Sequence, residues 1–193
     1  MTHIKADKKI ALIVVDVQES FKARGEVFWE SRGPKDFEQH IKSLVTGFRK
    51  AGQPIYFILH KDKDPGFSEN SPFFRVMDFL DYQPEEPLLI KQVHNSFTGT
   101  NLLPMLIREG IKRLVICGIR TEQCCETTTR VASDLGFEVD YVTQATLTFP
   151  LTHPFTGEKM TVEQIQTRTE MVLHGRFARI ATVHEVLQII NEA

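Results

Sequence analysis

Short apolar runs alternate with amphipathic segments along most of this chain. The apolar runs have the length and composition of buried strands. They lie at residues 9–15, 53–59, 88–91, 114–117, 137–142 and 177–181. The amphipathic segments have apolar side chains at helical spacing. They lie at residues 34–51, 100–110, 122–135, 161–174 and 182–190. This alternation predicts a three-layer α/β/α fold of Rossmann-like type, with a six-stranded, mainly parallel sheet between helices.

Three segments between these elements are expected to be loops, at residues 19–33, 61–87 and 143–160. The second is rich in charged residues, Gly and Pro, and residues 73–80 within it are expected to form a short helix. The third, with two prolines, is expected to be irregular. Nothing in the pattern divides the chain, so residues 1–193 are expected to form a single domain.

The segment 112–136 organises the prediction. A buried strand leads through a short turn to Thr121, which is expected to cap a helix that ends at Gly136. Cys124 and Cys125 then lie in the first helical turn, at the carboxyl end of a strand. Open α/β sheets bind ligands at this end, and backbone N–H groups there can stabilise a thiolate.

Composition and charge give no reason to expect several classes of partner and of stabilising site. The formal net charge of −2 gives no electrostatic reason to expect a nucleic acid or a membrane as partner. The longest apolar run near the start, residues 10–15, is too short for a signal sequence or a membrane span, so a cytoplasmic location is expected. The three cysteines lack zinc-site spacing, and their odd number argues against a disulfide framework.

Asp16, Lys91 and Cys124 each follow a predicted strand. Because the carboxyl ends of parallel strands meet at one edge of the sheet, these side chains are expected to converge there. Each alone has a simpler interpretation. Asp16 could end a strand, Lys91 could be solvated, and Cys124 could be a core residue. Together they offer a thiol nucleophile, a carboxylate to accept its proton and a cation to hold the cluster together.

Three motifs occur in order along the chain. The first is ALIVVDVQ at residues 11–18, with Phe21 following; the second is KQVHNSFTGTNL at 91–102; the third is CGIRTEQCCETTTRVA at 117–132. Together they resemble the isochorismatase-like cysteine hydrolase family, which includes nicotinamidases and N-carbamoylsarcosine amidase. The resemblance spans most of the chain.

The resemblance implies a catalytic triad of Asp16, Lys91 and Cys124. It also implies a cis peptide at Ile119–Arg120 and an oxyanion hole formed by the backbone N–H groups of Arg120 and Cys124. The implied reaction is hydrolysis of a C–N bond, in an amide or ureide of a small molecule, through a thioester on Cys124. The resemblance further implies a homo-oligomer, a dimer or larger.

Two departures from the family pattern bear on metal binding and on the site. Metal-binding members carry a D-x-H motif after the second strand, where this chain has His60 in the sequence HKDKDPGF. No metal and no other cofactor is therefore expected. The Asp that often follows the fifth strand is replaced by Gln144.

Several further residues are candidates for the substrate pocket. Phe21 lies at a family position that favours the pocket, although it could also pack beneath a loop. His94 could contact substrate or be a hydrogen-bonded loop residue. Trp29 is an aromatic candidate for closing the site, together with Phe67 and Phe73.

Other functions remain open on the sequence alone. A thiol-redox protein could use the adjacent Cys124 and Cys125, although adjacent cysteines strain a disulfide. An isochorismatase-type ether hydrolase and a catalytically silent protein of the same fold are further alternatives. Successive helical residues point about 100° apart, so Cys125 is expected to face the core while Cys124 faces the cleft. Cys117, inside a strand, is expected to be inert.

Overall fold

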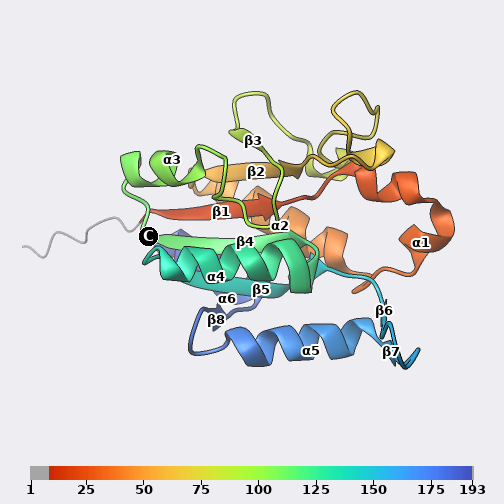
Figure 1. Cartoon of the computed structure of the whole chain (residues 1–193). Coiled ribbons are helices and arrows are strands. Elements are labelled where there is room, and N and C mark those ends of the chain that lie inside the picture. The colour runs from red at the N-terminus through yellow and green to blue at the C-terminus, as the bar shows by residue number, and fades with distance from the viewer. Residues whose placement is uncertain (1–8, 193) are drawn as a thin grey trace, which may run out of the picture.

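Six parallel strands form the centre of the molecule (Figure 1). The computed structural model describes residues 9–192. The strand order is β3-β2-β1-β4-β5-β8. The strands are β1 Ile10–Val15, β2 Ile55–His60, β3 Leu88–Lys91, β4 Arg113–Ile119, β5 Glu138–Leu147 and β8 Arg179–Ile180. Every pair in this sheet is parallel, so the predicted fold class is confirmed.

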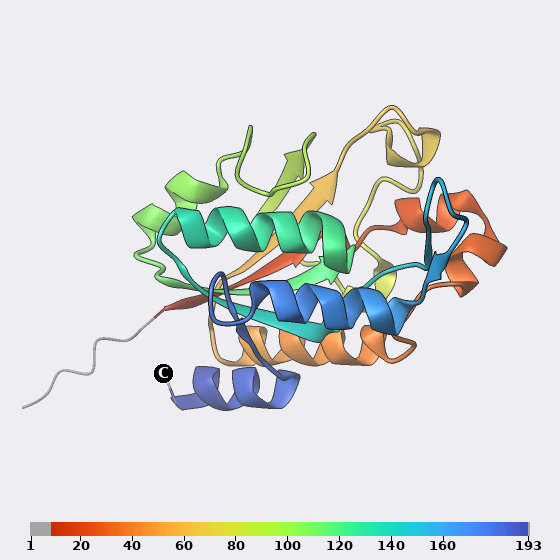
Figure 2. The same ribbon diagram turned by 60° about the horizontal axis from the view of Figure 1, so that its bottom comes forward.

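Helices cover both faces of the sheet (Figures 1 and 2). Successive strand residues point to opposite faces, and β1 is buried along its whole length. Its alternate residues Ile10, Leu12 and Val14 pack in a core with α2 and α6, whereas the residues between them pack in a second core with α3, α4 and α5. The main helices are α2 Phe37–Lys50, α3 Leu102–Arg108, α4 Glu126–Asp134, α5 Val162–Leu173 and α6 Val183–Glu192.

The strand order places the two central strands, β1 and β4, side by side. The helix after β1 covers one face and the helix after β4 covers the other. The two chain paths therefore diverge at the carboxyl ends of these strands, which is the switch point where such sheets bind ligands. Asp16 directly follows β1, and Cys124 lies five residues beyond the end of β4.

The start of the helix after β4 differs from the prediction. Thr121–Cys125 form a π-helical turn, and α4 begins at Glu126. Thr121 is not a capping residue, because its Oγ1 donates to Thr146 Oγ1 on β5, 2.8 Å away. A buried threonine can bond to a neighbouring strand as readily as to its own helix.

The segment 143–160 is more regular than predicted. Strand β5 continues to Leu147, and a small antiparallel hairpin follows, formed by β6 Leu151–Thr152 and β7 Lys159–Met160. The expected helix at 73–80 is reduced to a 3₁₀ turn, η3, at Asp78–Leu80. In these segments apolar and polar residues alternate over only a few positions, so the sequence pattern did not indicate the strands and the turn.

The remaining short elements lie around the carboxyl end of the sheet. They are η1 Glu19–Arg24, α1 Glu26–Glu30 and η2 Pro65–Phe67. The 3₁₀ turns η1 and η2 contribute side chains to the wall of the site described below. No helix within residues 9–192 is long and apolar enough to cross a membrane.

Candidate active site

Three side chains from separate strand ends meet at the carboxyl edge of the sheet. Lys91, the last residue of β3, places its Nζ 2.7 Å from Asp16 Oδ2 and 3.4 Å from Cys124 Sγ. Asp16 and Lys91 are each 1% exposed, and Cys124 is 9% exposed. The structure therefore brings together the carboxylate, ammonium and thiol groups that the sequence suggested would converge.

A histidine joins this cluster. His60 ends β2 directly opposite Lys91 in the β2–β3 pairing, and its Nδ1 lies 3.2 Å from Lys91 Nζ. Burial, followed by the charge of Lys91, lowers the pKa of His60. The neutral ring can then accept a hydrogen bond from the Lys91 ammonium. His60 was considered in the sequence only as a metal ligand, yet it ends a strand at the same edge as Asp16 and Lys91.

The backbone around Asp16 is held in an unusual conformation. Asp16 has a φ of 53°, in the left-handed region that non-glycine residues seldom adopt. Its N–H donates to Ile58 O, 2.9 Å away. The side chain of Gln18 bonds both main-chain groups of His60, at 2.7 Å to its N and 3.0 Å to its O. These contacts fix the ends of β1 and β2 relative to each other and so fix Asp16 beside His60.

The turn that carries Cys124 is anchored to β5. Tyr141 Oη donates to Thr121 O at 2.8 Å, and Cys125 N donates to Arg120 O at 3.1 Å. Single-turn π-helices are frequent at functional sites, because they change the direction of side chains along a helix. The Ile119–Arg120 peptide bond is cis, as predicted.

Burial sets the protonation state of the thiol. Burial, together with the neighbouring Asp16 carboxylate, raises the pKa of Cys124 to about 12, and Lys91 only partly opposes this. The sequence suggested a thiolate stabilised at a helix start, but the resting thiol is neutral at pH 7. Burial lowers the pKa of Lys91, but Asp16 and Cys124 outweigh it and the net shift is upward.

Asp16 is placed to accept a proton. Burial raises its pKa, against the opposing charge of Lys91. Its Oδ2 takes the Lys91 hydrogen bond, while its buried Oδ1 has no hydrogen-bond partner among the described residues. A buried carboxylate oxygen without a partner is costly, and a proton transferred to it would remove that cost.

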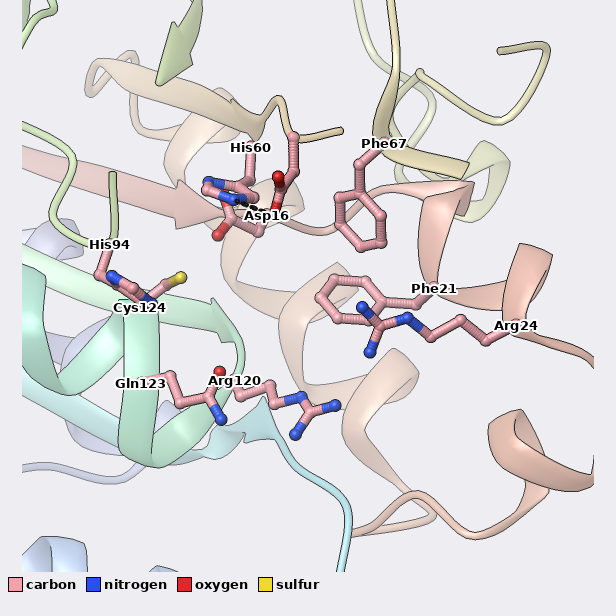
Figure 3. Close-up of a pocket in the computed structure, with 10 residues that line it drawn as sticks. Asp16, Phe21, Arg24, His60, Phe67, His94, Arg120, Gln123 and Cys124 are labelled. Atoms are coloured by element: carbon pink, nitrogen blue, oxygen red, sulfur yellow. Dashed lines mark ion pairs between the residues drawn. The ribbon is translucent and has the colours of Figure 1, made fainter. Parts of the chain in front are cut away.

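A cavity of about 310 Å³ opens onto the thiol (Figure 3). This volume suits a small molecule. The predicted pocket residues Phe21 and His94 both line it. The lining residues are Asp16, Phe21, Arg24, His60, Asp62, Phe67, His94, Arg120, Gln123 and Cys124.

Two of the aromatic candidates lie away from this cavity. Trp29 is not among its lining residues, so this structure gives no support to its predicted pocket role. Its ring is 6.3 Å from that of Phe149, and the Arg32 guanidinium lies 4.3 Å from its centre. Phe73 is 41% exposed and does not line the cavity either. Both belong to irregular segments, in which apolar spacing does not show which way a side chain points.

Four further lining residues were given no pocket role in the sequence, namely His60, Arg24, Asp62 and Gln123. Arg24 ends η1, and its guanidinium lies 5.5 Å from the ring of Phe67. Asp62 follows β2 and lies 3.8 Å from His60 Nε2. Loop residues reach the cavity through folding of 19–33 against 61–87, and no local pattern reports such a contact.

The other two cysteines are buried away from the cavity. Cys125 and Cys117 are both 0% exposed, and Cys125 packs in the core between the sheet and α4. Burial raises the pKa of both thiols. Cys125 therefore faces the core while Cys124 faces the cavity, as expected from helical spacing. Within residues 9–192, no group of three or more His, Cys, Asp or Glu side chains is arranged to hold a metal ion.

Comparison with known proteins places this geometry in context. A family model of the isochorismatase domain matches residues 10–172. The isochorismatase family protein YrdC of Bacillus subtilis is 31% identical over 190 residues, covering 96% of this chain and 97% of that protein. Nicotinamidase 3 of Arabidopsis thaliana is 27% identical over 158 residues, covering 74% of this chain and 75% of that protein. A crystal structure of an isochorismatase-family protein from Chromobacterium violaceum superposes with a TM-score of 0.89 at 23% identity, covering 97% of this chain and 96% of that one.

Proposed function

The chain belongs to the isochorismatase family, and from this premise we propose that it is a cysteine hydrolase that cleaves the C–N bond of a small amide or ureide. The observation that supports this most strongly is the buried contact of Lys91 Nζ with both Asp16 Oδ2 and Cys124 Sγ. Membership of the family supports a hydrolase, and the relative named nicotinamidase supports an amide bond as the target.

The reaction begins with a proton transfer. The resting thiol is neutral, so Asp16 Oδ1 accepts its proton as Sγ attacks the carbonyl carbon of the substrate. Lys91 stays protonated and holds both the carboxylate and the developing thiolate. His60 accepts a hydrogen bond from the same ammonium and so limits the directions in which it can point.

Cleavage follows from the tetrahedral intermediate. The proposed oxyanion hole consists of the N–H groups of Arg120 and Cys124, and one such donor lowers the barrier by about 3–4 kcal/mol in well-studied hydrolases. The intermediate collapses as the C–N bond breaks, and Asp16 returns its proton to the leaving nitrogen. Ammonia or an amine departs, and the acyl group remains on Cys124 as a thioester.

Water completes the cycle. Asp16, again ionised, accepts a proton from a water molecule as the oxygen attacks the thioester carbon. The C–S bond breaks, the acid product leaves and the proton returns to the thiol. The enzyme is regenerated with no net change in protons other than those of hydrolysis.

Paired cysteine variants test the proposal. A panel of small primary amides and N-carbamoyl compounds is screened for ammonia or amine release by the wild-type protein. We expect Cys124→Ala to lower kcat by at least about 10⁴-fold, because the nucleophile is removed. Cys125→Val is the matched control, since Val is the usual family residue there and roughly conserves volume, and we expect turnover within a few fold of wild type.

Alkylation, the turnover of the variants and a second type of substrate separate this proposal from its alternatives. Iodoacetamide should first alkylate Cys124, because the other two thiols are fully buried. A first adduct on Cys125, or full turnover by Cys124→Ala, would show that the triad is assigned wrongly. Release of product from an enol-ether probe, with no amide hydrolysed, would instead favour the isochorismatase-type ether hydrolase.

A further inference from the structure

One cation that lines the cavity has no ion-pair partner among residues 9–192. Arg120 is four residues before Cys124, lines the same cavity, and has a half-buried side chain. No ion pair or hydrogen bond joins its guanidinium to another residue in the described part of the chain. The nearest acidic influence is Glu122, whose Oε2 instead accepts from Thr148 Oγ1 at 2.6 Å. A cation held away from water without a counter-ion is costly.

Aromatic rings hold this guanidinium in place. It lies 4.8 Å from the ring centre of Phe149 and 5.7 Å from that of Phe28. Such contacts contribute about 0.5–2 kcal/mol and favour this position of the group. Ring contacts use none of the guanidinium N–H groups as hydrogen-bond donors, and no hydrogen bond to another residue within 9–192 uses them, so these N–H groups are available to a planar acceptor in the cavity.

The second arginine of the cavity, Arg24, already forms an ion pair with a residue of the protein. Arg24 Nη2 lies 3.1 Å from Asp64 Oδ2, so its charge is partly neutralised by the protein. Its guanidinium also lies over Phe28. In Figure 3, Arg24 and Arg120 extend from different elements into the same part of the cavity, beside Phe21. Arg24 therefore adds positive potential there, while Arg120 remains the free donor.

The acidic residues of the cavity lie around His60. Asp16 is bonded to Lys91, and Asp62 lies 3.8 Å from His60 Nε2. The cavity thus has a reacting end at Cys124 and a cationic end at Arg120, within about 310 Å³. We infer that Arg120 binds a carboxylate of the substrate, so that the enzyme acts on amides or ureides of small organic acids that carry this second, anionic group. This inference rests on the proposed function for the bond that is cleaved, but the anion site can be tested without turnover.

Protection of Cys124 from alkylation measures binding in the cavity directly. The probes are malonamate, succinamate and glutaramate, each paired with the neutral amide in which a methyl group replaces the carboxylate. Each is titrated against iodoacetamide, and labelling of the Cys124 peptide is read by mass spectrometry. We expect the best carboxylate of the series to protect at a concentration at least tenfold lower than its neutral partner.

Variants assign the preference to the guanidinium. Arg120→Met keeps an unbranched side chain but removes the charge, and should abolish the tenfold preference. Arg120→Lys keeps the charge without the planar fork, and should retain only part of it. Arg176→Met is the matched control, since Arg176 also lies over a phenylalanine ring, 5.7 Å from that of Phe177, but outside this cavity. It should keep the full preference.

Two results would overturn the inference. One is equal protection by carboxylates and their neutral partners in the wild-type protein, and the other is a preference that survives in Arg120→Met. Failure of the proposed hydrolysis would appear separately, as probes that protect Cys124 without releasing ammonia. Where a probe is hydrolysed, the ratio of kcat/KM between the acid and its neutral partner should follow the same order of variants.

Discussion

At the scale of single residues, the site depends on whether Asp16 or Cys124 carries one proton, and burial determines which of them does. Asp16 and Lys91 form an ion pair that is fully enclosed, and the thiol beside them is neutral because ionising it would add a second buried anion. Lys91 stabilises that anion only in part while Asp16 is ionised, and it does so more fully once Asp16 has become neutral by taking the proton. Under the proposed mechanism, the thiolate therefore forms during the attack and is not present in the resting enzyme.

This arrangement predicts an unusual pH profile. The active form has Asp16 ionised and Cys124 protonated. Because the pKa of Asp16 is raised, activity is lost as the pH falls through a value above the ordinary carboxyl pKa of about 4. Because the pKa of Lys91 is raised and that of Cys124 is about 12, no loss occurs on the alkaline side below about pH 10.

The measurement is kcat/KM as a function of pH for any amide of the panel that is hydrolysed. We expect kcat/KM to fall only on the acid side and to reach a plateau that extends to about pH 9. A mechanism that starts from a stored thiolate of ordinary pKa would instead rise about tenfold per pH unit up to about pH 8.5. Such a rise would contradict the proton transfer to Asp16.

Residues that follow an apolar strand were the easiest to predict from the sequence. Asp16, Lys91 and Cys124 could be brought together because parallel strands share an edge. His60 obeys the same rule and could have been included. Arg24 and Trp29 could not be assigned, because they lie in 19–33, where no period indicates whether a side chain faces the cavity or the core.

At the scale of elements, the close pairing of β1 and β4 brings Asp16 near the turn that carries Cys124. Val15 pairs with Gly118, one residue before Asp16 and six before Cys124. Gly118 has a φ of 130°, and a Cβ placed there would lie 2.0 Å from Val15 O. Only glycine allows the two strand ends to approach this closely.

Gly118→Ala should therefore lower the free energy of unfolding by about 2–4 kcal/mol, through overpacking and backbone strain together. It should also lower turnover, because relief of the clash moves Asp16 away from the cysteine turn. Gly136→Ala is the control, since it has a φ of 87° but nothing within 4 Å of the new Cβ, and it should cost about 1 kcal/mol. Urea unfolding measures the free energy of unfolding of both variants. An equal loss in the two would show that the close approach of β1 and β4 at Gly118 does not affect stability.

Helix boundaries could be predicted where a local signal exists. Thr161 caps α5 with a full capping box with Gln164, close to the predicted start. Thr121 looked similar in sequence, but Thr146 on β5 competes for its hydroxyl. Gln144, noted as a departure from the family, accepts a hydrogen bond from Val183 N at the start of α6. Hydrogen bonds between residues far apart in the sequence thus determine which side chains cap a helix, and the neighbouring sequence does not reveal them.

At the scale of the whole molecule, strand ends position the candidate catalytic residues, and the loops build much of the cavity wall around them. Alternation of strand and helix was sufficient to predict the strand edge on which the triad lies. The shape of the cavity depends on 19–33 packing against 61–87, for example through the edge-to-face contact of Phe21 and Phe67, 5.1 Å between ring centres. The substrate is therefore a question for binding experiments, whereas the proposal for the reacting bond rests on the contacts among Asp16, Lys91 and Cys124.

The most direct test of the central claim is the mass of the cysteine peptide during turnover. The wild-type protein is mixed with a saturating concentration of an amide that it hydrolyses, and the reaction is quenched in acid within the first turnovers. The protein is then digested and its peptides are analysed by mass spectrometry. We predict that the acyl portion of the substrate is bound to Cys124. An acyl group on any other side chain, or an unmodified Cys124 while ammonia release shows a burst, would contradict the thioester mechanism.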